Sequence, residues 1–159
     1  MSRILPLVIA AFFGVIALSL FLAPLLAPPN SIPDLSGSPY VLDHPSTWSM
    51  YTLGDVFCHQ VRDRCYIING NQMPFCTRCT GIILGLFLGT FIAALFVPGI
   101  KDPPSIWLTL GCILPLVVDG TGQWLGYWVS INPLRLITGL AFGGIGGVYI
   151  ILLVNLLRS

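Results

Sequence analysis

The sequence predicts an all-α integral membrane protein, a bundle of four transmembrane helices with a polar, cysteine-rich loop between the first and the second. Composition supports this fold class, because 55% of the 159 residues are hydrophobic, only 8% are charged, and the mean hydropathy is +0.89. An ordinary soluble domain carries about 25% charged residues, so too few charges remain here to cover a surface that faces water. Four apolar runs also approach the ~20 residues that a helix needs to cross a bilayer.

The four apolar runs account for the helices. They are predicted to cover residues 4–27, 80–97, 105–127 and 134–157 of one membrane domain that spans residues 1–159. A helix is required in each case because lipid offers backbone amides no hydrogen-bond partner. The first run is longer than the core of a signal peptide and ends at Ala-Pro, a poor cleavage site, so we expect it to be retained. The lipid bilayer of a cell membrane is therefore the expected environment of this multi-pass chain.

Residues 28–79 form the only long polar segment, which is rich in Pro, Ser, Asp and Asn. Within it, Asn69-Gly70 lies between an apolar run at 66–68 and Met73. This pattern predicts a short hairpin with a type I′ turn. The net charge of +1 and the lack of a basic run give no indication of nucleic-acid binding.

Polar residues in and beside the apolar runs are predicted to meet at one end of the bundle. Helices joined in this order alternate in direction, which places the polar loop, the start of the second helix, the end of the third and the start of the fourth on one side. The candidate polar or ligand-binding site there consists of Arg78, Asp119, Gln123, Asn132 and Arg135. Asp119 and Gln123 are four residues apart and therefore share one face of a helix.

Asp119 is the most informative of these residues because it interrupts an apolar run. A charge at such depth costs roughly 2.5–3.5 kcal/mol on insertion scales and is rarely left unpaired. Arg135, one short loop away in the chain, is the expected partner. The pair either joins the third helix to the fourth or forms a site for a polar substrate or a proton, and the sequence leaves both interpretations open.

Glycines recur at every fourth position in the second and fourth helices. The two series are Gly81, Gly85, Gly89 and Gly139, Gly143, Gly147. Small residues at this spacing let helix backbones approach closely. The two helices run in the same direction. They are either copies of one helical-hairpin unit, as in transporters built from parallel repeats, or independent uses of a residue that is common in membrane helices.

Four of the five cysteines and one of the two histidines lie close together in the polar loop. The candidate metal ligands are Cys58, His59, Cys65, Cys76 and Cys79. The two-residue spacing of Cys76 and Cys79 binds one metal ion or closes a redox disulfide. Zinc, which takes four tetrahedral sulfur or nitrogen ligands, is the expected ion, with iron as an alternative. Adjacent residues seldom both bind one ion, which favours Cys65 over His59 as the fourth ligand.

Two other interpretations of the cysteines remain open: a pair of disulfides, which needs an oxidising side of the membrane, and a catalytic dithiol. Arg3 precedes the first helix and no cation closely follows its end, which favours an inside amino terminus and a cysteine loop that faces out of the cell. Cys112 is expected to pack within the third helix, and His44 to lie in solvent.

Several of these motifs resemble a family of small bacterial and archaeal membrane proteins known as a domain of unknown function. The resemblance is carried by Cys58-His-Gln60, Pro74-Phe-Cys-Thr-Arg-Cys-Thr-Gly81, Asp119-Gly and Asn132-Pro-Leu-Arg-Leu-Ile-Thr-Gly139, and it extends from about Thr52 onward. It implies functional roles for Cys58, His59, Cys76, Arg78, Cys79, Asp119 and Arg135. Relatives often carry serine where Cys65 stands, which turns the assignment of the fourth ligand back toward His59. The resemblance names no reaction.

Three classes of function are compatible with these features. The first is a binding or transport module in which a metal site stands beside an embedded site for a small polar ligand or lipid headgroup. The second is a membrane enzyme, either a thiol–disulfide oxidoreductase that uses Cys76 and Cys79 or a metal-dependent hydrolase with Asp119 as base. The third is an accessory subunit of a larger membrane complex, or a homo-oligomer, for which the small size and the glycine-rich faces are suitable.

Overall fold

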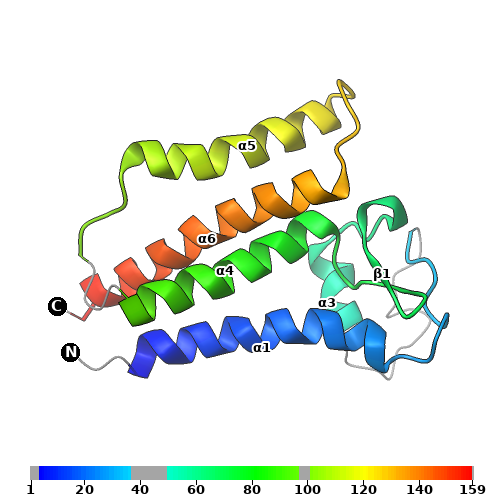
Figure 1. Cartoon of the computed structure of the whole chain (residues 1–159), viewed down its shortest axis with the longest axis horizontal. Coiled ribbons are helices and arrows are strands. Elements are labelled where there is room, and N and C mark those ends of the chain that lie inside the picture. The colour runs from blue at the N-terminus through cyan, green and yellow to red at the C-terminus, as the bar shows by residue number, and fades with distance from the viewer. Residues whose placement is uncertain (1–3, 37–49, 97–100, 159) are drawn as a thin grey trace.

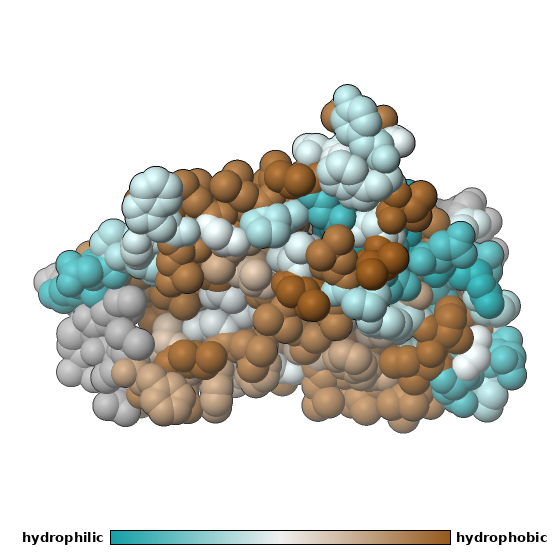
Figure 2. Space-filling view, turned by 45° about the horizontal axis from the view of Figure 1, so that its top comes forward, coloured by the Kyte–Doolittle hydropathy of each residue, from teal (hydrophilic) through white to brown (hydrophobic). Residues whose placement is uncertain are grey.

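Four long helices form the body of the molecule. A computed structural model describes residues 4–36, 50–96 and 101–158. The long helices are α1 (Ile4–Leu26), α4 (Thr77–Phe96), α5 (Ile106–Trp124) and α6 (Asn132–Leu156). Each is long and apolar enough to cross a membrane, and the face of the molecule shown in Figure 2 is largely apolar between its polar ends. The expected all-α membrane fold of four helices is confirmed.

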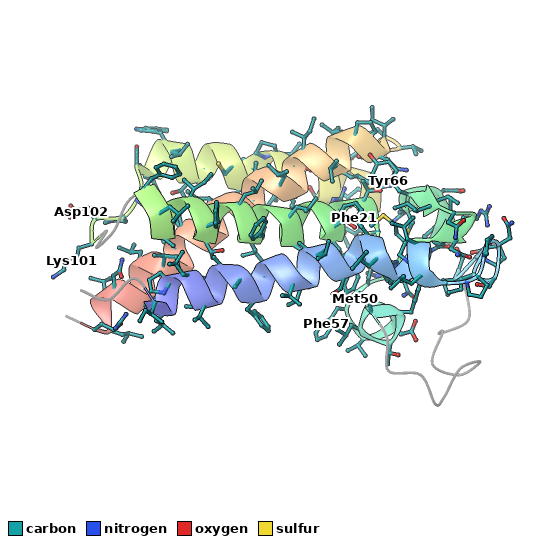
Figure 3. The ribbon with its side chains drawn as sticks, turned by 60° about the horizontal axis from the view of Figure 1, so that its bottom comes forward. Phe21, Met50, Phe57, Tyr66, Lys101 and Asp102 are labelled. Carbon is teal, nitrogen blue, oxygen red and sulfur yellow. The ribbon has the colours of Figure 1, made fainter. Side chains whose placement is uncertain are left out.

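Two expectations fall on residues that lie outside the described ranges, namely Arg3 and His44. The side of the membrane that the polar loop faces therefore stays a prediction. Lys101 and Asp102 lie at the end of the molecule opposite to Tyr66 and the polar loop (Figure 3).

Neighbouring helices follow the order α1, α4, α6, α5 (Figure 1). Helix α4 packs against both α1 and α6, and α5 packs against α6. Helices α4 and α6 start at the polar end and run parallel, whereas α1 and α5 run the other way (Figure 1). The parallel pair α4–α6 therefore forms the centre of the structure.

Glycines let the backbones of α4 and α6 touch. A Cβ atom on Gly85 would overlap the carbonyl oxygen of Leu140, and one on Gly143 would overlap the carbonyl oxygen of Ile82. The same reciprocal contacts occur one turn earlier and one turn later. In each case the α6 residue lies 58 positions after its α4 counterpart, so an approximate two-fold axis relates the two faces. The close approach expected from the glycine spacing is present, and the symmetry fits two copies of one helical-hairpin unit.

Helix α5 is attached more loosely. Its buried residues are Thr109, Asp119 and Gly122. The Thr109 hydroxyl lies 3.0 Å from the Tyr149 hydroxyl of α6, and Asp119 takes part in the ion pair described below. Large apolar side chains such as Trp107 remain exposed, which in a membrane places them against lipid.

The polar segment folds into a cap on one end of the helices. Its elements are α3 (Met50–Phe57), the short 3₁₀ helix η1 (Arg62–Arg64), and the strands β1 (Ile67–Ile68) and β2 (Asn71–Gln72). The strands pair antiparallel, and Asn69 and Gly70 between them have φ angles of 56° and 74°. Positive φ at both positions is the signature of a type I′ turn, so the expected hairpin is confirmed.

Three buried amide side chains hold the cap together. Asn71 donates to the carbonyl oxygen of Pro24 near the end of α1, at 3.0 Å. Gln72 donates to the carbonyl oxygen of Gln60 at 2.6 Å, and the Gln60 side chain donates to that of Pro74 at 3.0 Å. Each amide satisfies a backbone carbonyl that packing removes from water. These bonds fix the cap to α1 and to the start of α4.

Candidate metal centre and adjoining cavity

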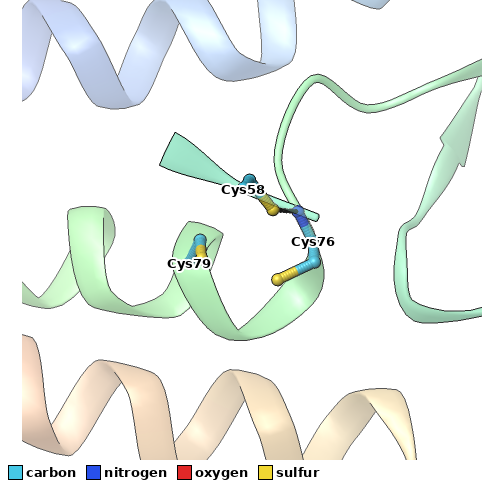
Figure 4. Close-up of side chains that lie close together, drawn as sticks. All are labelled: Cys58, Cys76 and Cys79. Carbon is cyan, nitrogen blue, oxygen red and sulfur yellow. Dashed lines mark hydrogen bonds between the residues drawn. The ribbon is translucent and has the colours of Figure 1, made fainter. Parts of the chain in front are cut away.

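Three cysteines meet where the cap joins α4. The Sγ atoms of Cys58, Cys76 and Cys79 lie within 4.8 Å of one another, and Figure 4 shows the three side chains grouped between the first turn of α4 and the segment that carries Cys58. A tetrahedral zinc ion with bonds of about 2.3 Å holds its sulfur ligands a little under ~4 Å apart. Small side-chain shifts would therefore bring all three sulfur atoms onto one ion. All five cysteines of the chain are free thiols.

Two separate segments position the cluster. Cys58 directly follows α3, and its N–H donates to the carbonyl oxygen of Gly54 at 2.8 Å. The N–H of Cys76 donates to the Sγ of Cys58 at 3.1 Å (Figure 4). Gln60 holds the two segments together through the carbonyl oxygen of Pro74, and a Cβ atom on Gly54 would overlap that same oxygen. The backbone of the cap therefore sets the distance between Cys58 and Cys76.

Cys76 occupies the N-terminus of α4. Its carbonyl oxygen accepts a hydrogen bond from the N–H of Thr80 at 2.9 Å, which makes it the capping residue of the helix. Hydrogen bonds from the thiols of Cys58 and Cys79 hold the pKa of Cys76 far below its ordinary value, and a helix N-terminus also favours a thiolate. The hydrogen bond to Cys76 raises the pKa of Cys58, which keeps its proton. One metal ion that replaced the thiol protons of these hydrogen bonds would bind all three sulfur atoms.

The two other predicted ligands lie outside this cluster. His59 is exposed and lines a cavity beside it. Cys65 is buried in the cap, where its Sγ accepts a hydrogen bond from Nε2 of Gln72 at 3.4 Å. Burial raises the pKa of the Cys65 thiol to about 12. The thiolate is the form that binds metals, whereas Cys65 is kept protonated by its burial in the cap. Its surroundings are therefore those of a packed thiol.

A cavity of about 380 Å³, here called the inner cavity, borders the cluster at the polar ends of α4, α5 and α6. Its sulfur-bearing and polar lining residues include Cys76, Cys79, Arg64, Arg78, Gln123 and Arg135. A wider cavity of about 740 Å³ adjoins it, shares Arg64, Gln123 and Arg135, and is also lined by Asn132. Four of the five residues of the predicted polar site therefore line these two neighbouring cavities, and Asp119 lines neither.

Asp119 pairs with Arg78, which corrects the expected pairing with Arg135. The Nη2 atom of Arg78 donates to Oδ2 of Asp119 in a salt bridge, and Gln123 accepts from the same nitrogen at 3.5 Å. Arg135 instead donates to Oδ1 of Asn132, three residues earlier in α6, at 2.8 Å. The partner of Asp119 thus comes from α4, which has few other contacts with α5. The ion pair bridges these two helices rather than α5 and α6.

Two residues outside the predicted site contribute to it. Arg64 lines both cavities, and its carbonyl oxygen accepts from the Thr77 hydroxyl at 2.8 Å. Gln60, with a φ of 44°, orders the loop that carries Cys58. Sequence signals for both existed: Arg64 is one of several cations gathered on the cap side, and Gln60 belongs to the Cys-His-Gln motif.

Comparison with known proteins identifies relatives of the chain. The family described as "Predicted membrane protein (DUF2085)" matches residues 58–150. An uncharacterised protein of Methanocaldococcus jannaschii is 32% identical over 144 residues, which cover 86% of this chain and 84% of the relative. An uncharacterised protein of Methanothermobacter thermautotrophicus is 38% identical over 86 residues, or 54% of this chain and 77% of the relative. No solved structure matches the chain. The protein therefore belongs to the DUF2085 family of predicted membrane proteins.

Proposed function

We propose that this multi-pass membrane protein is a metal-binding module in which Cys58, Cys76 and Cys79 hold one zinc ion. The convergence of three sulfur atoms within 4.8 Å, from segments on either side of the hairpin, supports this most strongly. Thiolates bind zinc readily, and iron is the second ion that such a set suits. The capping position of Cys76 adds the favourable field of a helix N-terminus for an anionic sulfur.

The inner cavity is the proposed ligand site of a binding or transport module. Three protein ligands leave the fourth position of a tetrahedral ion to water or to another molecule. Cys76 and Cys79 both line the inner cavity, so a molecule held there is within reach of that position. Arg78 and Arg135, which both line the inner cavity, supply hydrogen-bond donors for a polar ligand.

Metal analysis of protein purified in detergent tests the metal site. We expect about one zinc ion per chain in the wild type and its loss in the double variant Cys76→Ser/Cys79→Ser. The matched control is Cys112→Ser, which removes a thiol of α5 that lies outside the cluster and should leave the metal content unchanged. Cys65→Ser should also retain the ion, because Cys65 stands apart from the other three.

Thiol counting on the same samples shows which outcome would contradict the metal proposal. A preparation that contains no metal and shows disulfides among Cys58, Cys65, Cys76 and Cys79 by mass spectrometry would sink the metal proposal. Metal content that persists in the double variant would do the same, since two of the three proposed ligands are then gone.

A thiol–disulfide oxidoreductase is the second candidate. It is favoured by the position of Cys76 at a helix N-terminus with Cys79 one turn later, the arrangement that stabilises a reactive thiolate beside a resolving thiol. A metal-free protein whose Cys76 and Cys79 form a reversible disulfide with a glutathione redox buffer would select this function. Failure to form that disulfide would remove it.

A further inference from the structure

The charges around the inner cavity are unbalanced. Three arginines line it, and Arg78 already has the carboxylate of Asp119 as its partner. Among the described residues, Arg64 and Arg135 form no ion pair. In the described part of the chain, the only carboxylate on the walls of either cavity is that of Asp63, which lines the wider one. The inner cavity therefore presents excess positive charge.

Among these arginines, Arg135 carries the largest free-energy cost of burial, because its charge is buried without an ion-pair partner in the described ranges. It is only 3% exposed, and its Nε atom has no hydrogen-bond partner among the described residues. Arg64 and Arg78 lie close enough to repel its guanidinium, and this repulsion is partly offset by Asp119 and Cys76. A buried cation with an unused donor and like-charged neighbours is strongly stabilised by an anion. Guanidinium groups match phosphate oxygens in pairs of parallel hydrogen bonds, which makes phosphate the best-fitting anion.

An apolar groove lies deeper along the same helices. It encloses about 320 Å³ between α4, α5 and α6, and its walls include Gly85, Cys112, Leu140, Ala141 and Gly144. The same three helices form walls of the inner cavity. Gly85 lies seven positions after Arg78 along α4, a rise of about 10 Å. The groove exists because α5 rests on α6 and stands away from α4.

Together the polar cavity and the apolar groove match the polarity of one kind of molecule. We propose that the inner cavity binds the phosphate headgroup of an anionic lipid whose hydrocarbon chain lies in the groove between α4 and α5. This lipid proposal rests on the proposed function, in which the inner cavity is a ligand site, and it specifies the class of ligand. The headgroup meets Arg64 and Arg135 at the polar end of the helices, and the chain extends toward the middle of the membrane, the orientation that a lipid has in a bilayer.

Lipid retention measured by native mass spectrometry tests the proposal. Purified full-length protein in neutral detergent is titrated with phosphatidic acid, with diacylglycerol of the same chains, and with inorganic phosphate. We expect binding of phosphatidic acid that neither diacylglycerol nor inorganic phosphate displaces at equal concentration. Arg64→Gln and Arg135→Gln should each weaken it about tenfold or more, the effect of losing one charge-assisted hydrogen bond. Arg64 is exposed, so its variant reports on binding even if the Arg135 variant does not fold.

Matched variants separate the headgroup from the chain. Arg158→Gln changes an exposed arginine at the opposite end and should bind phosphatidic acid as the wild type does. Ala141→Phe fills the groove and should weaken binding, whereas Gly111→Phe, at a position with nothing within 4 Å of its Cβ, should not. Equal binding of phosphatidic acid and diacylglycerol would overturn the headgroup site. Displacement by equimolar inorganic phosphate would show a site for free phosphate instead and overturn the lipid.

Zinc content in the same samples keeps the two proposals apart. Zinc-loaded protein that does not bind phosphatidic acid overturns the lipid site alone. Protein that binds phosphatidic acid but contains no zinc overturns the metal site alone. Unchanged binding in both Arg64→Gln and Arg135→Gln would show that the cavity does not hold the headgroup.

Discussion

The α4–α6 interface and the attachment of α5 join helices in opposite ways. Between α4 and α6, backbone meets backbone along three turns, with glycines on both sides. Helix α5, by contrast, is held by side chains: an ion pair from Asp119 to Arg78, a hydroxyl contact from Thr109 to Tyr149, and little other burial. The first interface depends on the absence of side chains, and the second depends on a few polar ones.

This difference assigns separate roles to the two regions. Backbone contacts leave no rotamers to adjust, so the α4–α6 pair is a rigid base on which the cap and Cys79 are built. Two polar contacts near the ends of α5 fix its ends but leave space against α4, where the inner cavity and the groove lie. Changes in the first region should therefore destroy the fold, whereas changes in the second should loosen α5 and leave the rest folded.

The largest effect is expected at the glycines. Gly85→Leu and Gly143→Leu each place a side chain against a backbone carbonyl of the facing helix, and we expect a loss of about 3 kcal/mol or more, the upper range for overpacking. The measurement is thermal unfolding in detergent. Gly111→Leu on α5 is the control, since nothing lies within 4 Å of its Cβ. Equal unfolding temperatures for all four proteins would show that α4 and α6 do not touch.

An intermediate effect is expected at the ion pair. Asp119→Asn or Arg78→Gln alone should cost about 2 kcal/mol, because the surviving charge loses its partner in a largely buried setting. The double variant should recover part of this loss. A double-mutant cycle on thermal stability measures the coupling. The matched cycle of Asp119→Asn with Arg135→Gln should show a weaker coupling, because Asp119 attracts Arg135 but Arg135 donates its hydrogen bond to Asn132. Strong coupling there with none to Arg78 would reverse the assignment.

The smallest effect is expected at the other end of α5. Tyr149→Phe removes the hydroxyl that faces Thr109 and should cost about 0.6 kcal/mol, the average for such bonds between membrane helices. Thr109→Val should give a similar loss, and the double variant no more than either alone. Additive losses from the two changes would mean that these hydroxyl groups do not meet.

The fold and the site were predictable from the sequence to different depths. Hydropathy identified the helices because every backbone amide in lipid must be bonded within a helix, and Asn69-Gly70 identified the hairpin because few other pairs adopt two positive φ angles. The predicted partner of Asp119 was wrong. Arg135 was expected because it is near in the chain, whereas Arg78 reaches Asp119 from a helix that is more distant in sequence.

The position of Cys65 depended on tertiary packing as well. Its position in the sequence is compatible with a metal ligand, but within the cap its sulfur accepts a hydrogen bond from the side-chain amide of Gln72. The role of Gln72 in turn depends on the loop at Gln60, whose carbonyl it also binds. Such side chain–backbone contacts between distant residues leave no periodic pattern in a sequence, so only the fold reveals them.

The reciprocal glycine faces have a consequence for synthesis. In the described part of the chain, the face of α4 that contains Gly85 packs against the backbone of α6, which is made after α1, α4 and α5. A chain that stops at Ser130 keeps this face open, and a second truncated α4 offers it the same spacing that α6 would. We expect such truncated chains to cross-link as parallel dimers in detergent, and Gly85→Leu to prevent this; truncated chains that stay monomeric would contradict it. A truncated chain is therefore expected to self-associate through the glycine face of α4, whereas in a chain that contains α6 this face is already covered.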